Sequence, residues 1–148
     1  MVQKYKKWLA PLFAAYCVLM LWLLFGQRWG QSGGGLNLEL LRTLKLFWRV
    51  IVHGGSRAQK IHAVVNLLGN VVMFVPLGFL VPCLWCKMQH FGWHILTMIT
   101  TIVAVEVLQL LLGLGTCDVD DLLLNLVGTT LGFVVFKLWN IWNRRGED

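Results

Sequence analysis

A small set of polar side chains stands within or beside apolar stretches of this 148-residue chain, and these are the groups able to do chemistry. A carboxyl group such as that of Glu106 can donate or accept a proton, and carboxamides can hold a ligand by hydrogen bonds. Glu106 is therefore the best catalytic candidate, although the sequence assigns no reaction to it. The candidate binding residues are Asn66, Asn70, Glu106, Gln109, Asp118, Asp121 and Asn125.

The spacing of these residues places them in pairs on helix faces. Asn66 and Asn70 are four residues apart, and Glu106 precedes Gln109 by three. The acidic segment repeats the four-residue step, with an asparagine four positions after Asp121. Residues three or four apart lie on the same side of an α-helix. The sequence therefore predicts three helices that each present one polar face.

The composition identifies the surroundings of these helices as a membrane. Hydrophobic residues make up 57% of the chain and charged residues only 14%, against about 45–50% and about 25% in average soluble domains. A short domain has too little interior to bury that much apolar surface. We predict an all-α membrane protein, a bundle of about four transmembrane helices in a single domain. The predicted spans are residues 8–25, 63–86, 95–114 and 122–142.

A segment at about residues 36–53 differs from the predicted spans. Arg42, Lys45 and Arg49 recur at steps of three and four residues, so they form one basic stripe on a helix. Three cations are too many for a span, which favours an interfacial or partly re-entrant amphipathic helix. The stripe is a candidate contact for lipid headgroups, although simple attraction to an anionic membrane surface explains it equally well.

The distribution of positive charge predicts the orientation. Basic residues flank the apolar segments, which favours anionic lipids over nucleic acid as the partner of this chain with net charge +6. With four spans both termini lie on one side, and a slight excess of lysine and arginine falls on that side. The positive-inside rule then predicts a multi-pass protein with cytoplasmic N- and C-termini.

In this topology the polar faces converge in the outer half of the bilayer. Polar groups in hydrocarbon are costly and normally face the interior of a bundle. We therefore expect one outward-facing polar pocket rimmed by Asp118, Asp120 and Asp121. Structural alternatives stay open, because buried amides often join helices by hydrogen bonds. Asp118 is also well placed to cap the fourth helix, with Asp121 in its first turn.

Two further patterns have structural explanations. Gly128 and Gly132 form a GxxxG motif, which is typical of close helix packing. Cys83 and Cys86 form a CxxC pair near His90, but they end an apolar segment and are interpreted as small apolar residues. We expect neither a metal site nor a cofactor.

In order and spacing, these residues resemble the VanZ-like family of small bacterial membrane proteins. The matching stretches are residues 66–78 (NLLGNVVMFVPLG), 106–109 (EVLQ) and 118–128 (DVDDLLLNLVG), followed by Gly132. One departure is that Gly115-Thr116 stands where many relatives carry an arginine. The family is named after a protein associated with low-level resistance to the glycopeptide teicoplanin. The resemblance implies a bacterial plasma-membrane protein of the cell envelope.

Three classes of function remain. The preferred one is a binding protein for a lipid or a lipid-linked cell-wall precursor, or one that alters glycopeptide (teicoplanin) susceptibility. The first alternative is a membrane enzyme acting on a lipid headgroup with Glu106 as acid or base, although no nucleophile–base pair accompanies it. The second alternative is a small transporter, which four spans allow only as an oligomer. The sequence leaves the oligomeric state open.

Overall fold

The structure is a computed structural model of the chain, and it describes residues 2–26, 35–37, 39, 41–114 and 116–145. Within these residues, four helices are long and apolar enough to cross a membrane. This finding confirms the predicted number of spans and the predicted all-α membrane bundle. The long helices are α1 (Val2–Leu21), α3 (Arg57–Leu84), α4 (Phe91–Leu111) and α5 (Val119–Arg145).

Short elements connect the long helices. A π-helical turn, η1 (Trp22–Gly26), continues α1, and a 3-10 turn, η2 (Cys86–Gln89), joins α3 to α4. The α3 helix begins before the predicted span because Ser56 and Gln59 form a capping box. The Ser56 Oγ accepts from the Gln59 backbone N–H at 3.3 Å, and the Gln59 Oε1 accepts from the Ser56 N–H at 2.9 Å. Two otherwise unpaired backbone donors are satisfied in this way.

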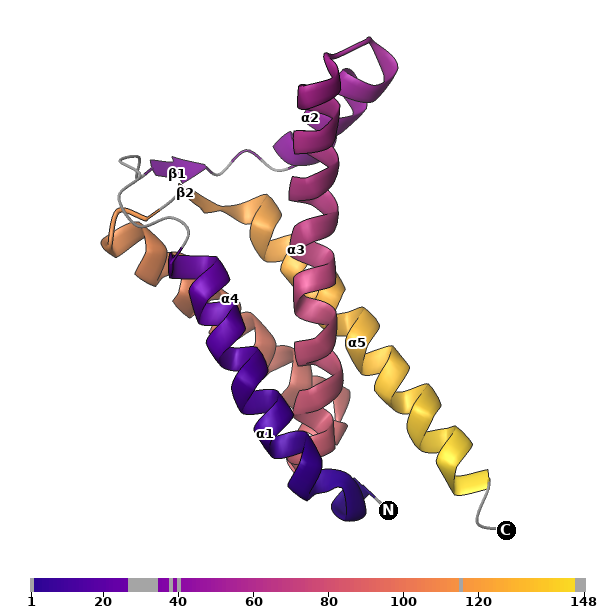
Figure 1. Cartoon of the computed structure of the whole chain (residues 1–148). Coiled ribbons are helices and arrows are strands. Elements are labelled where there is room, and N and C mark those ends of the chain that lie inside the picture. The colour runs from indigo at the N-terminus through magenta and orange to yellow at the C-terminus, as the bar shows by residue number, and fades with distance from the viewer. Residues whose placement is uncertain (1, 27–34, 38, 40, 115, 146–148) are drawn as a thin grey trace.

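Glycines form the crossing of α3 and α5, the most extensive contact between helices (Figure 1). A methyl group built on Gly78 would collide with the Thr129 carbonyl, and one on Gly132 with the Val75 carbonyl. A methyl group on Gly128 would collide with the backbone of α3 in the same way. The backbones therefore approach more closely than any side chain allows, as the GxxxG motif predicted.

The other two long helices pack against this crossing, α1 on α3 and α4 on α5. Tyr16 of α1 donates a hydrogen bond to the Met73 carbonyl of α3. The α4 helix packs on α5, where the rings of Phe91 and Phe133 lie 5.5 Å apart. One apolar core cluster contains Phe74 and Ile102, and a second contains Cys83, Phe133 and Phe136.

A shorter helix, α2 (Arg42–Val52), packs beside the N-terminal part of α3 (Figure 1). It occupies only part of the amphipathic segment predicted at residues 36–53. Ahead of it, β1 (Gly35–Asn37) pairs in parallel with β2 (Thr116–Asp118), so that Asn37 lies opposite Asp118. Nothing in the sequence pattern revealed this strand pair, which ties the segment before α2 to the segment before α5.

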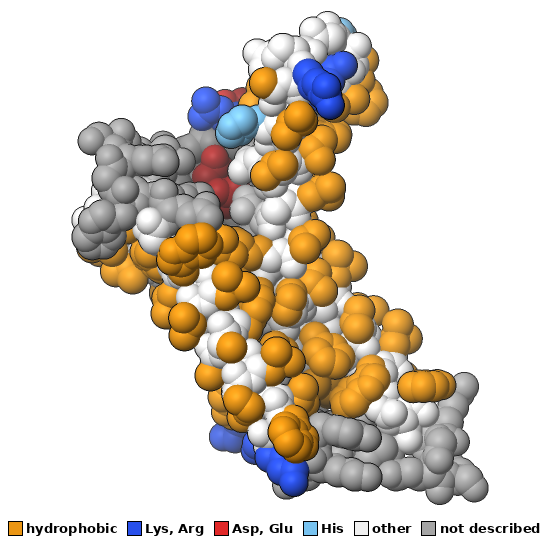
Figure 2. Space-filling model, viewed as in Figure 1, with side chains coloured by type: hydrophobic (Ala, Val, Ile, Leu, Met, Phe, Trp, Pro, Cys, Tyr) orange, Lys and Arg blue, Asp and Glu red, His pale blue; other side chains and the backbone are white. Residues whose placement is uncertain are grey.

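The bundle has two dissimilar ends. The start of α1 and the end of α5 lie at the same end of the bundle, which we call the terminal end, as expected for an even number of spans (Figure 1). The strand pair, α2 and the start of α5 lie at the opposite end, which we call the polar end. Figure 2 shows a largely hydrophobic surface between them, with Lys and Arg side chains at both ends and Asp and Glu side chains at the polar end.

Candidate functional site

Asp118 begins the site by capping α5. It ends β2, and its Oδ1 accepts a hydrogen bond from the Asp120 backbone N–H at 2.9 Å. A side-chain oxygen that accepts from the second residue of a helix satisfies one of its unpaired donors. The capping role that the sequence allowed for Asp118 is therefore present.

Asp120 joins two helices that are far apart in the sequence. Its side chain is buried, with 3% exposed. Its Oδ1 accepts from the Leu41 N–H and its Oδ2 from the Thr43 N–H, both at 2.6 Å. Leu41 precedes α2 in a left-handed conformation (φ 63°) and provides no side-chain cap of its own. Asp120 thus supplies both the cap and the favourable negative charge at the start of α2.

The next residue, Asp121, bonds to α3. Its Oδ1 accepts a hydrogen bond from the Asn70 Nδ2 at 2.6 Å, and both side chains are half-buried. The residues are 51 positions apart, and the predicted polar faces of two spans meet here. Charge-assisted bonds of this kind are stronger than bonds between neutral groups.

Glu106 connects α4 to the same segment. Only 6% of its side chain is exposed, and its Oε2 accepts from the Asp118 backbone N–H at 3.3 Å. The end of α4 makes this contact possible. Gly113 adopts a left-handed conformation (φ +66°), and the Leu114 N–H returns to the Gln109 carbonyl at 2.9 Å. This glycine-terminated helix end turns the chain back toward Glu106.

The remaining polar residues separate into different environments. Gln109 is buried, and its Nε2–H donates to the backbone carbonyl of Leu24 at 2.8 Å, so it provides a hydrogen-bond partner for η1. Asn125 is 4% exposed, and its Oδ1 has no hydrogen-bond partner among the described residues. Asn66 lies exposed on α3, one turn from Asn70. The structure therefore brings together four of the predicted residues, which we call the polar cluster: Asn70, Glu106, Asp118 and Asp121.

The basic stripe lies on α2, next to the polar cluster in the fold because Asp120 holds the start of that helix. Arg42, Lys45 and Arg49 are all exposed. Lys45 makes an exposed ion pair with Glu39 at 3.6 Å, a type of pair that contributes about 0–1 kcal/mol. Trp48 is 65% exposed on the same helix. Exposed cations and an exposed indole on one helix are typical of the membrane interface.

The described cysteine and histidine side chains lie outside the polar cluster. In the described part of the chain, no three His, Cys, Asp or Glu side chains are grouped closely enough to hold a metal ion. Cys83 is buried in an apolar cluster, whereas Cys86 is exposed.

His94 on α4 was missed by the sequence reasoning. It is fully buried against Phe133, with ring centroids 4.7 Å apart. Its ring nears the Thr129 backbone without good hydrogen-bond geometry.

Sequence reasoning also missed the role of Asp120, which it placed only on the rim of the pocket. No local pattern marks a residue that caps a helix 77 positions away. His94 was overlooked because it falls just before the predicted span that starts at residue 95. If the predicted span had begun one turn earlier, it would have included His94 on its interior face.

Comparison with known proteins identifies the family of the chain. A family model described as VanZ/LLP1 matches residues 13–140, which include α3 and α4 in whole, most of α5, the C-terminal part of α1 and every member of the polar cluster. No curated protein and no solved structure matches the chain. The extent of the family match shows that the chain belongs to the VanZ/LLP1 family of membrane proteins.

Proposed function

We propose that this VanZ-like protein binds the headgroup of a lipid or of a lipid-linked cell-wall molecule at the polar end of the bundle. In this proposal the polar end faces the outside of a bacterial plasma membrane, and both termini are cytoplasmic. The bound molecule is held partly by the polar cluster and partly by the cations of α2. The sequence and fold support the proposal in three steps.

The observation that carries the proposal is the convergence of polar groups from separate spans. Asn70 bonds to Asp121, and Glu106 bonds to the backbone of Asp118. Asn125 lies one helical turn beyond Asp121, and its buried Oδ1 lacks a partner among the described residues. A buried unpaired carbonyl costs about 1–3 kcal/mol. A hydroxyl, amide or ammonium donor on a ligand would recover that free energy.

The second step is the charge of α2. Arg42, Lys45 and Arg49 give this exposed helix a basic face, and phosphate is the anion that lipid headgroups offer. Guanidinium groups bind phosphate with two parallel hydrogen bonds. Because Asp120 fixes the start of α2 to the acidic segment, the phosphate-binding and donor-binding groups belong to one site.

The chemistry of the bound molecule follows from combining the polar groups near Asn125 with the cations of α2. A molecule that suits both carries phosphate next to hydroxyl, amide or amine donors, and a lipid tail keeps it at this depth. Lipid-linked sugars of the cell envelope have this chemistry, as do some phospholipids. Sequestering or exposing such a molecule would alter how a glycopeptide reaches its target, so the proposal includes a change in teicoplanin susceptibility.

Lipid binding in detergent tests the proposal, with undecaprenyl phosphate as the probe and phosphatidylcholine as the reference. We expect tighter binding of undecaprenyl phosphate. The Arg42→Gln/Arg49→Gln double variant should weaken it about tenfold, which corresponds to about 1.4 kcal/mol. Arg57→Gln/Lys60→Gln removes two cations at the start of α3 and serves as the matched control, with affinity unchanged. Equal loss in both variants would show that only overall charge matters and would overturn the proposal.

A second variant separates binding from structural support. Asn125→Leu removes the unpartnered carbonyl oxygen at similar volume. If that oxygen serves a ligand, the unfolding temperature is unchanged or raised while affinity for undecaprenyl phosphate falls. A lowered unfolding temperature with unchanged affinity would instead assign Asn125 to helix packing.

A further inference from the structure

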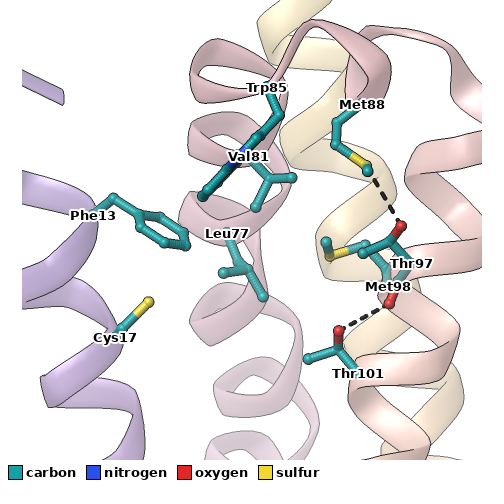
Figure 3. A pocket seen from close by; sticks show the side chains of 9 residues that line it. All are labelled: Phe13, Cys17, Leu77, Val81, Trp85, Met88, Thr97, Met98 and Thr101. Carbon is teal, nitrogen blue, oxygen red and sulfur yellow. Dashed lines mark hydrogen bonds between the residues drawn. The ribbon is translucent and has the colours of Figure 1, made fainter. Parts of the chain in front are cut away.

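A separate cavity lies near the terminal end of the bundle, between α1, α3 and α4. Its volume is about 340 Å³, within the range of about 300–1,000 Å³ that is common for small-molecule sites. Figure 3 shows side chains from α1 on one side and from α4 on the other, with α3 between them. The lining residues are Phe13, Cys17, Leu77, Val81, Trp85, Met88, Thr97, Met98 and Thr101.

The lining of this groove suits hydrocarbon rather than a polar molecule. Most of the side chains are apolar or carry sulfur. The two hydroxyls are already engaged, because Thr101 donates to the Thr97 carbonyl at 2.9 Å and Thr97 donates to the Met88 Sδ at 3.4 Å (Figure 3). Neither hydroxyl needs a hydrogen bond from an occupant.

The position of the groove identifies what surrounds it. The α1 helix packs on α3, whereas α4 packs on α5. The groove is lined by α1, α3 and α4, three helices long and apolar enough to cross a membrane. Lipid acyl chains, and not water, fill the surroundings of a protein at that depth.

Positive charge lies at the terminal end of the groove. Lys6 and Lys7 are exposed within the first two turns of α1, and Lys87 is exposed next to Met88 in η2. Figure 2 shows Lys and Arg side chains at this end of the surface. Trp85 lines the groove and is 48% exposed, as suits an indole at the headgroup level. An apolar groove ending among cations complements a lipid with a negatively charged phosphate.

We propose that this groove binds one acyl chain of an anionic glycerophospholipid from the leaflet at the terminal end, with the phosphate next to Lys6, Lys7 and Lys87. The bound lipid fills the gap between α1 and α4. This role fits α1, which has the lowest buried share of the four long helices. The site lies at the opposite end from the polar cluster, so it stands independently of the proposed headgroup site.

Native mass spectrometry of the detergent-solubilised protein, titrated with phosphatidylglycerol or phosphatidylcholine, tests the proposal. One phosphatidylglycerol should bind at least about tenfold more tightly than phosphatidylcholine. Cys17→Trp fills the groove from α1 and should remove this binding. Val18→Trp adds the same bulk at a neighbouring lipid-facing position, 68% exposed, and should leave it intact. Thr101→Phe fills the groove from α4 and replaces Cys17→Trp if that variant does not fold.

A charge variant tests where the phosphate lies. Lys87→Gln should lower the preference for phosphatidylglycerol about fivefold, whereas Lys137→Gln, an exposed cation of α5, should not change it. Equal affinity for both lipids, or equal effects of Cys17→Trp and Val18→Trp, would overturn the proposal. A dimer that Cys17→Trp dissociates would also overturn it, since a second copy of the chain would then occupy the groove.

Discussion

The two ends of the bundle are held by different forces. At the polar end, side chains and backbone of α2, α3, α4 and α5 are joined by hydrogen bonds to the short segment Asp118–Asp121. At the terminal end, aromatic rings and small apolar residues meet, as where Phe79 lies 5.7 Å from Trp139. Hydrogen bonds are directional, so they fix which groups pair at the polar end. Apolar contacts are not directional, so the packing at the terminal end can leave a groove. Among the described residues, two buried side chains have polar atoms without a hydrogen-bond partner: Asn125, beside the polar cluster, and His94 on α4. The candidate site lies at the polar end because Asn125 is accompanied there by carboxyl and amide groups from three helices.

Both ends depend on the glycine crossing between them, so its disruption has the largest expected effect. Gly132→Ala forces a methyl group against the Val75 carbonyl and should lower the free energy of unfolding by about 2–3 kcal/mol. Thermal unfolding in detergent, followed by circular dichroism, measures the change.

Gly69→Ala is the matched control for this variant. Nothing lies within 4 Å of a methyl group built on Gly69, so alanine should be neutral or stabilise the helix by up to about 1 kcal/mol. Equal destabilisation by both variants would contradict close packing as the reason for glycine at the crossing.

Loss of the hydrogen bonds between Asp120 and the start of α2 has the next largest expected effect on stability. Asp120→Ala removes both acceptors from the start of α2, at an expected cost of about 2 kcal/mol. Hydrogen exchange should then accelerate at the Leu41 and Thr43 amides, which Asp120 holds. Ser56→Ala, which breaks the local cap of α3, should cost about 1 kcal/mol and leave α2 unaffected. Unchanged exchange in α2 after Asp120→Ala would contradict the capping role.

Sequence patterns predicted the local and periodic features and missed the long-range ones. Four spans followed from hydropathy, and the pairing of Asn70 with Asp121 agreed with polar faces at helical spacing. The strand pair and the cap from Asp120 to α2 each depend on residues more than 75 positions apart. Such contacts arise from the fold as a whole. Asn66, one turn before Asn70 on α3, is exposed in the structure, and its place in the binding site stays a prediction.

The smallest expected effect distinguishes binding from catalysis at Glu106. Glu106→Gln keeps an oxygen that can accept from the Asp118 N–H but removes the ability to exchange a proton. If the site only binds, folding is retained and affinity for undecaprenyl phosphate changes by less than about threefold. If Glu106 acts as acid or base on a lipid headgroup, the protein still folds and binds while turnover of that lipid is abolished.

Binding of an external headgroup requires the polar end to face the outside of the cell. A variant that keeps Cys117 as its only cysteine, at the middle of β2, reports on this directly when intact cells are treated with a membrane-impermeant maleimide. Reaction of Cys117 in intact cells is the predicted result. Protection of Cys117 until the cells are broken open would place the polar cluster on the cytoplasmic side and contradict binding of an external headgroup.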